Sequence, residues 1–324
     1  MSSDDARPVV AVAGARGFIG QALAPLLGEA FERRGLAALG REPGFGGYDR
    51  WEACDLFSLR DAEEALRGAR RAVYLVRAHR PSSRLTQARI IDLDLVCADN
   101  FARAARSNGV ERIIYLGGRR EVEETLGAHG VPLVALRAGP VIGAGGAAWL
   151  ALSRLVRHLP VIACPSWTRT VTRPIAVADA AALLAACLTS DAVPPGAYEV
   201  GGPEAVSCRD LVLRTARALG LHRRIVALPF DALAASRLAL GAVTGLPQAI
   251  IAPLFEDLVR PSGGDRALQA RPAWARARST RRWPTRSRPS ARHRPRPIRA
   301  RPAPRRGAGR DRQRARGACA RCSG

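Results

Sequence analysis

The sequence predicts an α/β protein of the Rossmann type, in which helices cover both faces of a doubly wound parallel sheet. Three observations lead to this class. An apolar, β-branched run at residues 9–13 passes through three glycines directly into a helical repeat of apolar residues. Strand-like apolar segments then alternate with amphipathic helices as far as Arg137. A chain of 324 residues is long enough for one such domain and a smaller appended region.

The glycine turn after the first strand predicts a site for a dinucleotide. Gly14, Gly17 and Gly20 follow the strand at intervals of three residues. In such a turn the first glycine permits a tight bend, the second lets the backbone approach a pyrophosphate, and the third lets helix and strand pack closely. The helix that follows offers N–H groups and a partial positive charge to the phosphates. A glycine turn without a ligand is the alternative, and the order strand, glycines, helix favours the dinucleotide.

Two arginines favour NADP over NAD. Residues 36–39 predict a second strand that ends at Gly40-Arg41-Glu42. Arg41 at this strand end and Arg16 in the glycine turn would accommodate the 2′-phosphate of NADP. Glu42 leaves NAD as an alternative cofactor, because a carboxylate there would bind the 2′-hydroxyl of its ribose. The alternative for both arginines is an ordinary solvated position.

The remaining elements of the first half alternate in the same way. We expect strands at 51–56, 71–76, 111–116 and 132–137, and helices at 58–66, 86–107 and 120–129. Ser58 and Asp61 form a cap for the first of these helices, and Asn108-Gly109 ends the second.

The second half predicts further helices at 147–158, 180–188 and 209–219. Asp179 caps or opens the second of these, and Ser207 with Asp210 forms a capping box for the third. The polar segment 167–173 is interpreted either as substrate-facing or as an exposed connection. Residues 238–255 carry no charge, but glycines and prolines interrupt them. They therefore predict two short buried helices and no transmembrane span.

Six segments in this order resemble the short-chain dehydrogenase/reductase superfamily, in its atypical branch of NAD(P)-binding, epimerase-like and nitrogen-metabolite-repressor-like proteins. The segments are Gly14-Ala15-Arg16-Gly17-Phe18-Ile19-Gly20, Cys54-Asp55-Leu56, and residues 113–118, 136–143, 173–179 and 198–204. The resemblance covers about residues 8–258. It implies an NAD(P)-binding Rossmann domain at 1–145, followed by a substrate or lid region at 146–260 that packs on it.

The resemblance also implies roles for single residues. Asp55 would face the adenine and Arg41 the adenosine ribose, while Val76-Arg77-Ala78 would lie along the cofactor. The cofactor-binding residues expected on this basis are Gly14, Ala15, Arg16, Gly17, Phe18, Ile19, Gly20, Arg41, Asp55, Leu56, Val76 and Arg77.

The chain departs from that superfamily at its catalytic residues. Its reductases use a Tyr-x-x-x-Lys pair and a serine after the fifth strand, where the lysine lowers the tyrosine pKa so that the phenol can pass a proton. This chain contains no lysine, and Gly117 and Gly118 stand in place of the serine. Tyr115 is interpreted as a core residue of its strand. No catalytic residue is assigned, and whether the protein is an enzyme stays open.

Three functions are compatible with this pattern. The first is an NAD(P)-binding oxidoreductase or epimerase that acts on an unidentified carbonyl or sugar-nucleotide-like small molecule. The second is a redox sensor or assembly protein that binds NADP without turnover and contacts a protein partner. The third is nucleic-acid binding through the basic C-terminal tail, which the composition of that tail disfavours.

The net charge of +23 comes mostly from this tail. Residues 1–260 contain 31 arginines and 26 acidic residues, whereas residues 261–324 contain 20 arginines and 2 acidic residues. The tail is rich in Arg, Pro and Ala and nearly lacks aliphatic residues, so we expect it to be disordered. Arginines attract phosphate, but the absence of lysine and a composition typical of GC-rich codons favour a frameshifted end.

Cysteine and histidine usage disfavours a metal site. The seven cysteines are scattered, as is typical of buried thiols in a reducing compartment, and the acidic N-terminus does not resemble a secretory signal. A cytoplasmic location is expected. Cys319 and Cys322 form a single CxxC motif, which without a second pair of ligands is insufficient for a zinc site. The five histidines do not cluster into a metal site or a triad.

Overall fold

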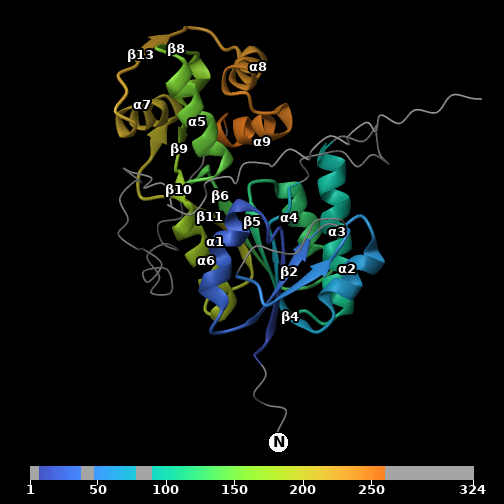
Figure 1. The fold of residues 1–324 in the computed structure, drawn as a ribbon. Helices are drawn as coiled ribbons and strands as arrows, with labels where there is room; N and C mark the ends of the chain where they lie inside the picture. Colours follow the sequence, from blue (N-terminus) through green and yellow to red (C-terminus); the bar gives the residue numbers. More distant parts are fainter. Residues whose placement is uncertain (1–6, 38–46, 78–89, 260–324) are drawn as a thin grey trace, which may run out of the picture. The chain divides into compact units, whose positions relative to one another are not determined.

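The fold is built on a parallel sheet. The computed structural model describes residues 7–37, 47–77 and 90–259, and all of these belong to one structural unit. Within the described residues the sheet has seven strands, in the order β11-β6-β5-β4-β1-β2-β3, and each pairs in parallel with its neighbours (Figure 1). The strands are β1 (Val9–Ala13), β2 (Glu32–Ala37), β3 (Arg50–Ala53), β4 (Ala69–Tyr74), β5 (Arg112–Gly117), β6 (Leu133–Ala138) and β11 (Gly196–Val200). The Rossmann-type α/β class predicted from the sequence is confirmed.

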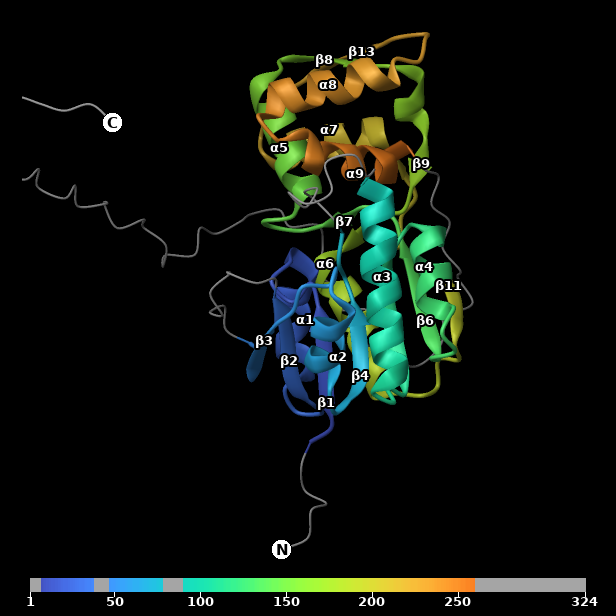
Figure 2. The same cartoon turned by 90° about the vertical axis from the view of Figure 1, so that its right-hand side faces the viewer.

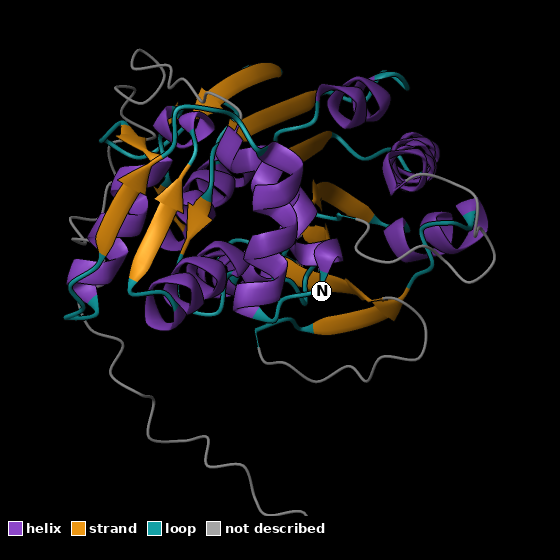
Figure 3. Ribbon diagram, turned by 90° about the horizontal axis from the view of Figure 1, so that it is seen from above, coloured by secondary structure: helices purple, strands orange, loops and turns teal. Residues whose placement is uncertain are grey.

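Helices cover both faces of the sheet, as the views from the side and from above show (Figures 2 and 3). Helices α1 (Phe18–Leu27) and α6 (Val177–Thr189) share one apolar cluster with the sheet. Helices α2 (Leu59–Leu66), α3 (Ile90–Ser107) and α4 (Arg120–Gly127) share the cluster on the other face. Val10 and Val12 point into the first cluster and Ala11 and Ala13 into the second, because side chains alternate along a strand. Burial on both faces explains the continuous apolar run of β1.

A third apolar cluster holds the later helices together. Helices α5 (Ala147–His158), α7 (Cys208–Ala218), α8 (Leu233–Thr244) and α9 (Gln248–Val259) belong to it. Three short strand pairs and a 3₁₀ turn connect them: β7 (Val141–Ile142) with β10 (Ile175–Ala176), β8 (Val161–Cys164) with β13 (Arg224–Ala227), β9 (Val171–Thr172) with β12 (Val206–Ser207), and η1 (Ser166–Arg169).

The sheet continues into the second half of the chain. Strand β11 pairs with β6, and α6 packs against α1 on the first face. Residues after position 145 therefore complete the Rossmann sheet before the chain returns to the third cluster.

The predicted start of the second strand is wrong. Strand β2 begins at Glu32, four residues before the apolar segment that suggested it. Charged residues form its first half because Arg34, only 9% exposed, donates from its guanidinium to the carbonyls of Ala65 and Arg67 at 3.1 and 2.7 Å. The arginine thereby satisfies carbonyl groups at the end of α2. The predicted end of this strand, residues 38 and 39, lies outside the described residues.

Both serines cap their helices as predicted, but the reciprocal bond of a capping box is not formed, because each aspartate accepts the serine hydroxyl instead of the serine N–H. The hydroxyl of Ser58 accepts the backbone N–H of Asp61 at 3.2 Å, and that of Ser207 accepts the N–H of Asp210 at 3.1 Å. Asp179 does not cap its helix, since α6 begins at Val177, and it lies in the first turn. An acidic residue there still interacts favourably with the helix dipole.

Residues 238–255 fall in α8 and α9, which confirms two helices. The prediction that both are buried is wrong for α8, because Leu238 is 59% exposed and only Gly241 and Thr244 of this helix are buried. No helix in the described part of the chain is long and apolar enough to cross a membrane. The five cysteines among the described residues are buried and free, as expected. The predicted disordered tail lies outside the described residues.

Candidate dinucleotide site

The turn between β1 and α1 has the geometry that its glycines predict. Gly14 has a φ of +86°, which favours glycine, and a Cβ there would lie 3.0 Å from the backbone carbonyl carbon of Leu75, just after β4. The N–H of Gly17 donates to the carbonyl of Gly14 at 2.8 Å and closes the turn. Gly14 therefore allows both the bend and the close approach of the neighbouring chain.

The other two glycines differ in their surroundings. A Cβ on Gly20 would lie 2.6 Å from the carbonyl oxygen of Gly14, so only glycine lets α1 pack this closely against the turn. Gly17 is exposed, and a Cβ there would meet only the Gly14 oxygen, at 3.0 Å. Gly20 thus serves packing, whereas Gly17 leaves the backbone open to a ligand.

The N-terminus of α1 carries no side-chain cap. Gly17 is the N-cap residue, and the first intrahelical bond runs from the N–H of Gln21 to its carbonyl, at 3.0 Å. The N–H groups of Phe18, Ile19 and Gly20 therefore have no acceptor within the helix. The side chain of Gln21 donates to the Arg16 carbonyl at 2.8 Å and holds the turn. Such an N-terminus suits a phosphate.

Two aromatic residues, Phe18 and Tyr48, lie beside this turn and contact the segments around it. The ring of Phe18 packs on the loop after β7, because a Cβ on Gly143 or Gly146 would lie 2.8 Å from it. The hydroxyl of Tyr48 donates to the Gly20 carbonyl at 2.7 Å, and burial raises the pKa of this phenol. These contacts fix α1 relative to the segments on either side of it.

Asp55, expected to face the adenine, lies after β3 in a hydrogen-bonded loop. Its Oδ1 accepts the backbone N–H of Phe57 at 3.1 Å, and its carbonyl accepts that of Ser58 at 2.9 Å. The side chain of Asn100 on α3 donates to the Leu56 carbonyl at 2.9 Å. Within the described ranges, Oδ2 of Asp55 makes no hydrogen bond and is available as an acceptor.

Tyr115 fills the space above Gly117, one of the two glycines that stand in place of the serine expected from the resemblance. A Cβ on Gly117 would lie 2.1 Å from the Tyr115 hydroxyl oxygen and 2.4 Å from its Cζ. Tyr115 is 4% exposed, and burial raises the pKa of its phenol, although the backbone N–H of Arg119 donates to it. The prediction that Tyr115 is a core residue is confirmed by this burial.

Ion pairs connect α9 to the ends of β4 and β5. The guanidinium of Arg77 binds both carboxylate oxygens of Asp257, at 3.0 and 3.1 Å. Arg119 binds Asp94 on α3 and Glu256, each at 3.0 Å. Burial acts to lower the pKa of Arg77, but the carboxylate of Asp257 more than offsets this and the pKa is raised. We call these five residues the α9 clasp.

The structure brings most of the predicted site residues to the carboxyl edge of the sheet. The glycine turn, with Ala15 buried and Arg16 half-buried, lies beside the chain that leaves β4, whose Val76 packs in the second apolar cluster. Asp55 and Leu56 follow the carboxyl end of β3, which β2 separates from β1. Arg77 is placed in the α9 clasp, and Arg41 lies outside the described residues. Among the described residues no cluster of His, Cys, Asp and Glu could hold a metal ion.

Sequence reasoning missed Tyr48, Asn100 and the clasp partners of Arg77. One signal for the clasp was present, since Glu256 and Asp257 are the only charged residues of the apolar helix α9. Their partners are distant in sequence, however, since Arg77 and Asp257 are 180 positions apart.

Part of the chain is similar in sequence to known proteins. Residues 10–125 match the NAD dependent epimerase/dehydratase family. A curated relative, "Auxiliary protein GraX" of Staphylococcus aureus, is 34% identical over 134 residues, which are 39% of this chain and 43% of that protein. The chain thus matches less than half the length of that relative.

Solved structures share the fold at low sequence identity. The Citrobacter sp. triphenylmethane reductase complexed with NADP(H) is 17% identical, with a TM-score of 0.60 and coverage of 80% of this chain and 94% of that one. MoeE5 in complex with UDP-glucuronic acid and NAD is 20% identical, with a TM-score of 0.56 and coverage of 77% and 98%. The Thermus thermophilus UDP-glucose 4-epimerase complex with NAD is 18% identical, with a TM-score of 0.52 and coverage of 77% and 98%.

Proposed function

We propose that this chain, whose residues 10–125 match the NAD dependent epimerase/dehydratase family, binds a nicotinamide dinucleotide at the carboxyl edge of its sheet. The observation that carries the proposal is the division of roles among three glycines. Gly14 bends the turn, Gly20 packs it, and Gly17 stays exposed beside uncapped N–H groups. The structural neighbours hold NAD or NADP(H), which supports the same assignment.

Two parts of the site, the N-terminus of α1 and Asp55, fit such a cofactor. The N–H groups of Phe18, Ile19 and Gly20 would donate to the pyrophosphate, as helix N-termini do for anions. Oδ2 of Asp55 would accept the adenine amino group while Oδ1 remains bound to Phe57. Arg16 and Arg41 would face the adenosine ribose, and we propose on this basis that NADPH is preferred over NADH.

The cofactor domain would comprise residues 1–145, and residues 146–260 would add the substrate region, with α6 and β11 returning to the sheet. The substrate class that we propose is a carbonyl compound or a sugar nucleotide. The UDP-glucuronic acid complex and the UDP-glucose 4-epimerase among the structural neighbours support the sugar-nucleotide part of this class.

The chemistry at the nicotinamide end favours a second candidate function. A bound nicotinamide supplies or accepts hydride, and a carbonyl reductase must also move a proton. Tyr115 is poorly suited to that step, because it is buried, its pKa is raised and no lysine exists to lower it. The second candidate is therefore a non-catalytic dinucleotide-binding sensor or assembly protein. The word "auxiliary" in the name of the staphylococcal relative is consistent with this role.

The test is a calorimetric titration of the full chain with NADPH and NADH, followed by a screen of carbonyl compounds and sugar nucleotides. Binding of either dinucleotide supports the proposal, and no binding of either one overturns it. Turnover distinguishes the two candidates. Brisk turnover that Tyr115→Phe abolishes would assign the phenol to catalysis, whereas binding with slow or absent turnover supports the sensor or assembly protein.

A further inference from the structure

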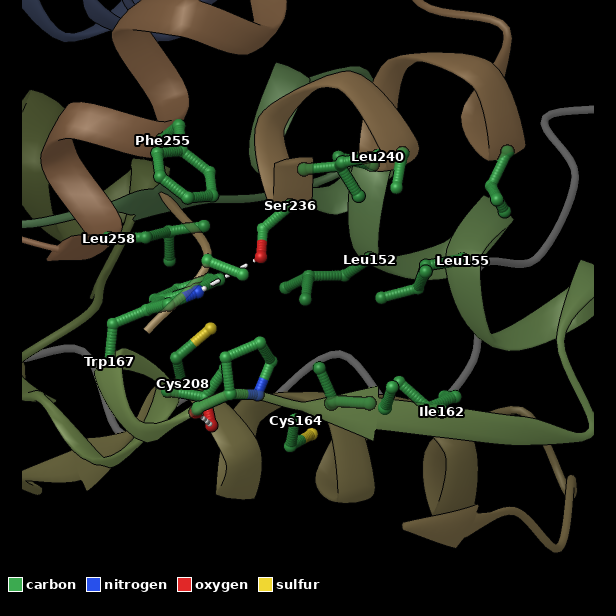
Figure 4. A pocket seen from close by; sticks show the side chains of 18 of the residues that line it. Leu152, Leu155, Ile162, Cys164, Trp167, Cys208, Ser236, Leu240, Phe255 and Leu258 are labelled. Carbon is green, nitrogen blue, oxygen red and sulfur yellow. Dashed lines mark hydrogen bonds between the residues drawn. The ribbon is translucent and has the colours of Figure 1, made fainter. Parts of the chain in front are cut away.

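A pocket lies in the third apolar cluster, between α5, α8, α9 and β8, and it is partly open to solvent along α8, where Ala235 and Ala239 are exposed. Its volume is about 300 Å³, and most of its lining is aliphatic or aromatic (Figure 4). Larger side chains that define it are Leu152, Leu155, Ile162, Leu240, Phe255 and Leu258. We call it the apolar pocket. None of the residues assigned to the dinucleotide lines it.

The apolar pocket is partly open, and it is larger than the voids of a packed protein core. Interiors pack almost as densely as organic crystals, and voids larger than a water molecule are few. An engineered apolar cavity of about 150 Å³ stays dry and binds benzene. At roughly 30 Å³ for each water-sized group, the apolar pocket has room for about ten non-hydrogen atoms.

Small residues on α8 create this space. Ala235, Ser236 and Ala239 of α8 face the cavity and leave it unfilled opposite α5. The same helix is largely exposed, with Leu233 43% and Leu238 59% accessible to solvent. An apolar ligand would therefore meet an apolar surface beside the cavity before it enters.

The polar atoms of the wall already have partners. The indole N–H of Trp167 donates to the Ser236 hydroxyl at 3.2 Å, as Figure 4 shows, and the hydroxyl of Thr168 donates to the Pro165 carbonyl at 2.6 Å. The thiol of Cys208 is neutral, because burial raises its pKa to about 12. No polar atom of these side chains requires a bond from a ligand, so the chemistry of the wall favours a ligand without charge.

Trp167 also gives the apolar pocket a natural reporter. Its ring packs against Phe255 with a centroid distance of 4.7 Å, and both rings line the cavity. A ligand in the cavity would therefore contact an indole whose fluorescence responds to heavy atoms.

We propose that the apolar pocket binds a neutral hydrocarbon group, a chain or ring of about ten non-hydrogen atoms, independently of the dinucleotide site. The probes are 1-decanol, which is of about this size, and its brominated form 10-bromo-1-decanol. The first is expected to raise the melting temperature of the full chain, because a ligand that binds only the folded state stabilises it. The second is expected to quench tryptophan fluorescence, and Trp167→Phe should remove most of that quenching.

A matched pair of variants on α5 tests the location. Ala151→Leu places a larger side chain in the cavity, whereas Ala147→Leu makes the same change at an exposed position four residues earlier. We expect Ala151→Leu to lose both effects and Ala147→Leu to keep both. If Ala151→Leu does not fold, the loss of quenching in Trp167→Phe, with the melting shift retained, makes the same test.

Three results would overturn the proposal. They are the absence of a melting shift in the unmodified chain, an unchanged shift in a folded Ala151→Leu variant, and stronger stabilisation by decanoate than by decanol. The last would assign the site to a charged ligand.

Discussion

The hydroxyl of Tyr115 lies directly over Gly117, so that a Cβ at position 117 would be 2.1 Å from the phenolic oxygen. A side chain at position 117 and the observed position of the Tyr115 ring exclude each other, since any side chain there requires the ring to move. In this chain the space above Gly117 is therefore filled by an aromatic ring from the same strand.

The first prediction follows from this contact. Gly117→Ser should lower the free energy of unfolding by about 1–3 kcal/mol, as overpacking of a core does. The matched control is Gly127→Ser, since a Cβ at Gly127 meets only Leu133, at an ordinary 3.6 Å. Urea denaturation compares the two variants. Equal stability of both would mean that Tyr115 moves aside without cost.

The α9 clasp leads to the second prediction. The Arg77–Asp257 pair is bidentate and partly buried, with side chains 31% and 21% exposed. A double-mutant cycle with Arg77→Leu and Asp257→Asn should give a coupling energy of about 0.5–3 kcal/mol. The exposed Arg60–Glu64 pair serves as the control, for which about 0.3–0.5 kcal/mol is expected. A coupling energy for the clasp no larger than that of the control would contradict its structural role.

The fold was predictable where the signal is local. The strand, glycines and helix from Val9 to Leu27 each carry their own periodicity, and burial of β1 on both faces gives a continuous apolar run. The start of β2 was not predictable in this way. Arg34 is compatible with a buried strand only because carbonyls at Ala65 and Arg67, more than thirty residues away, accept its hydrogen bonds.

The residues of the site also differ in whether a local sequence signal predicts them. The glycine turn and Asp55 were identified from spacing, whereas the α9 clasp depends on a helix 180 residues from Arg77. The apolar pocket was missed because it arises from residues that are too small, such as Ala235 and Ala239, and small residues give no positive signal in a sequence.

A third prediction concerns the cofactor preference. Arg41→Ala should weaken NADPH binding by about tenfold or more and leave NADH almost unchanged, because a hydrogen bond between a guanidinium and a phosphate contributes about 1.5–3 kcal/mol. Arg60→Ala, at an exposed position on α2, is the control. Both affinities are measured by titration. Equal losses for the two cofactors in Arg41→Ala would remove the arginine from the 2′-phosphate site.

The buried thiols lead to a prediction about pH. Burial raises the pKa of Cys187 from 9.0 to about 12, so the native thiol stays protonated where the unfolded thiol ionises. The unfolded state then binds fewer protons than the native state, and stability must fall as pH rises from about 9 towards 12. Cys187→Ala should show a shallower fall than the unmodified chain in urea titrations between pH 8 and 10.5. Parallel curves would mean that this thiol ionises in the folded protein.

A dinucleotide bound at the glycine turn would lie beside Gly17, so its affinity for two variants of this residue is the decisive measurement. Asp and Asn are both good N-cap residues, so Gly17→Asp and Gly17→Asn should both fold. They differ in one charge, which would lie beside the pyrophosphate and cost about 1–4 kcal/mol at 4 Å. Titration with NADPH should show at least tenfold weaker binding to Gly17→Asp than to Gly17→Asn. Equal affinity of the two variants and the unmodified chain would contradict the assignment of the turn to the cofactor.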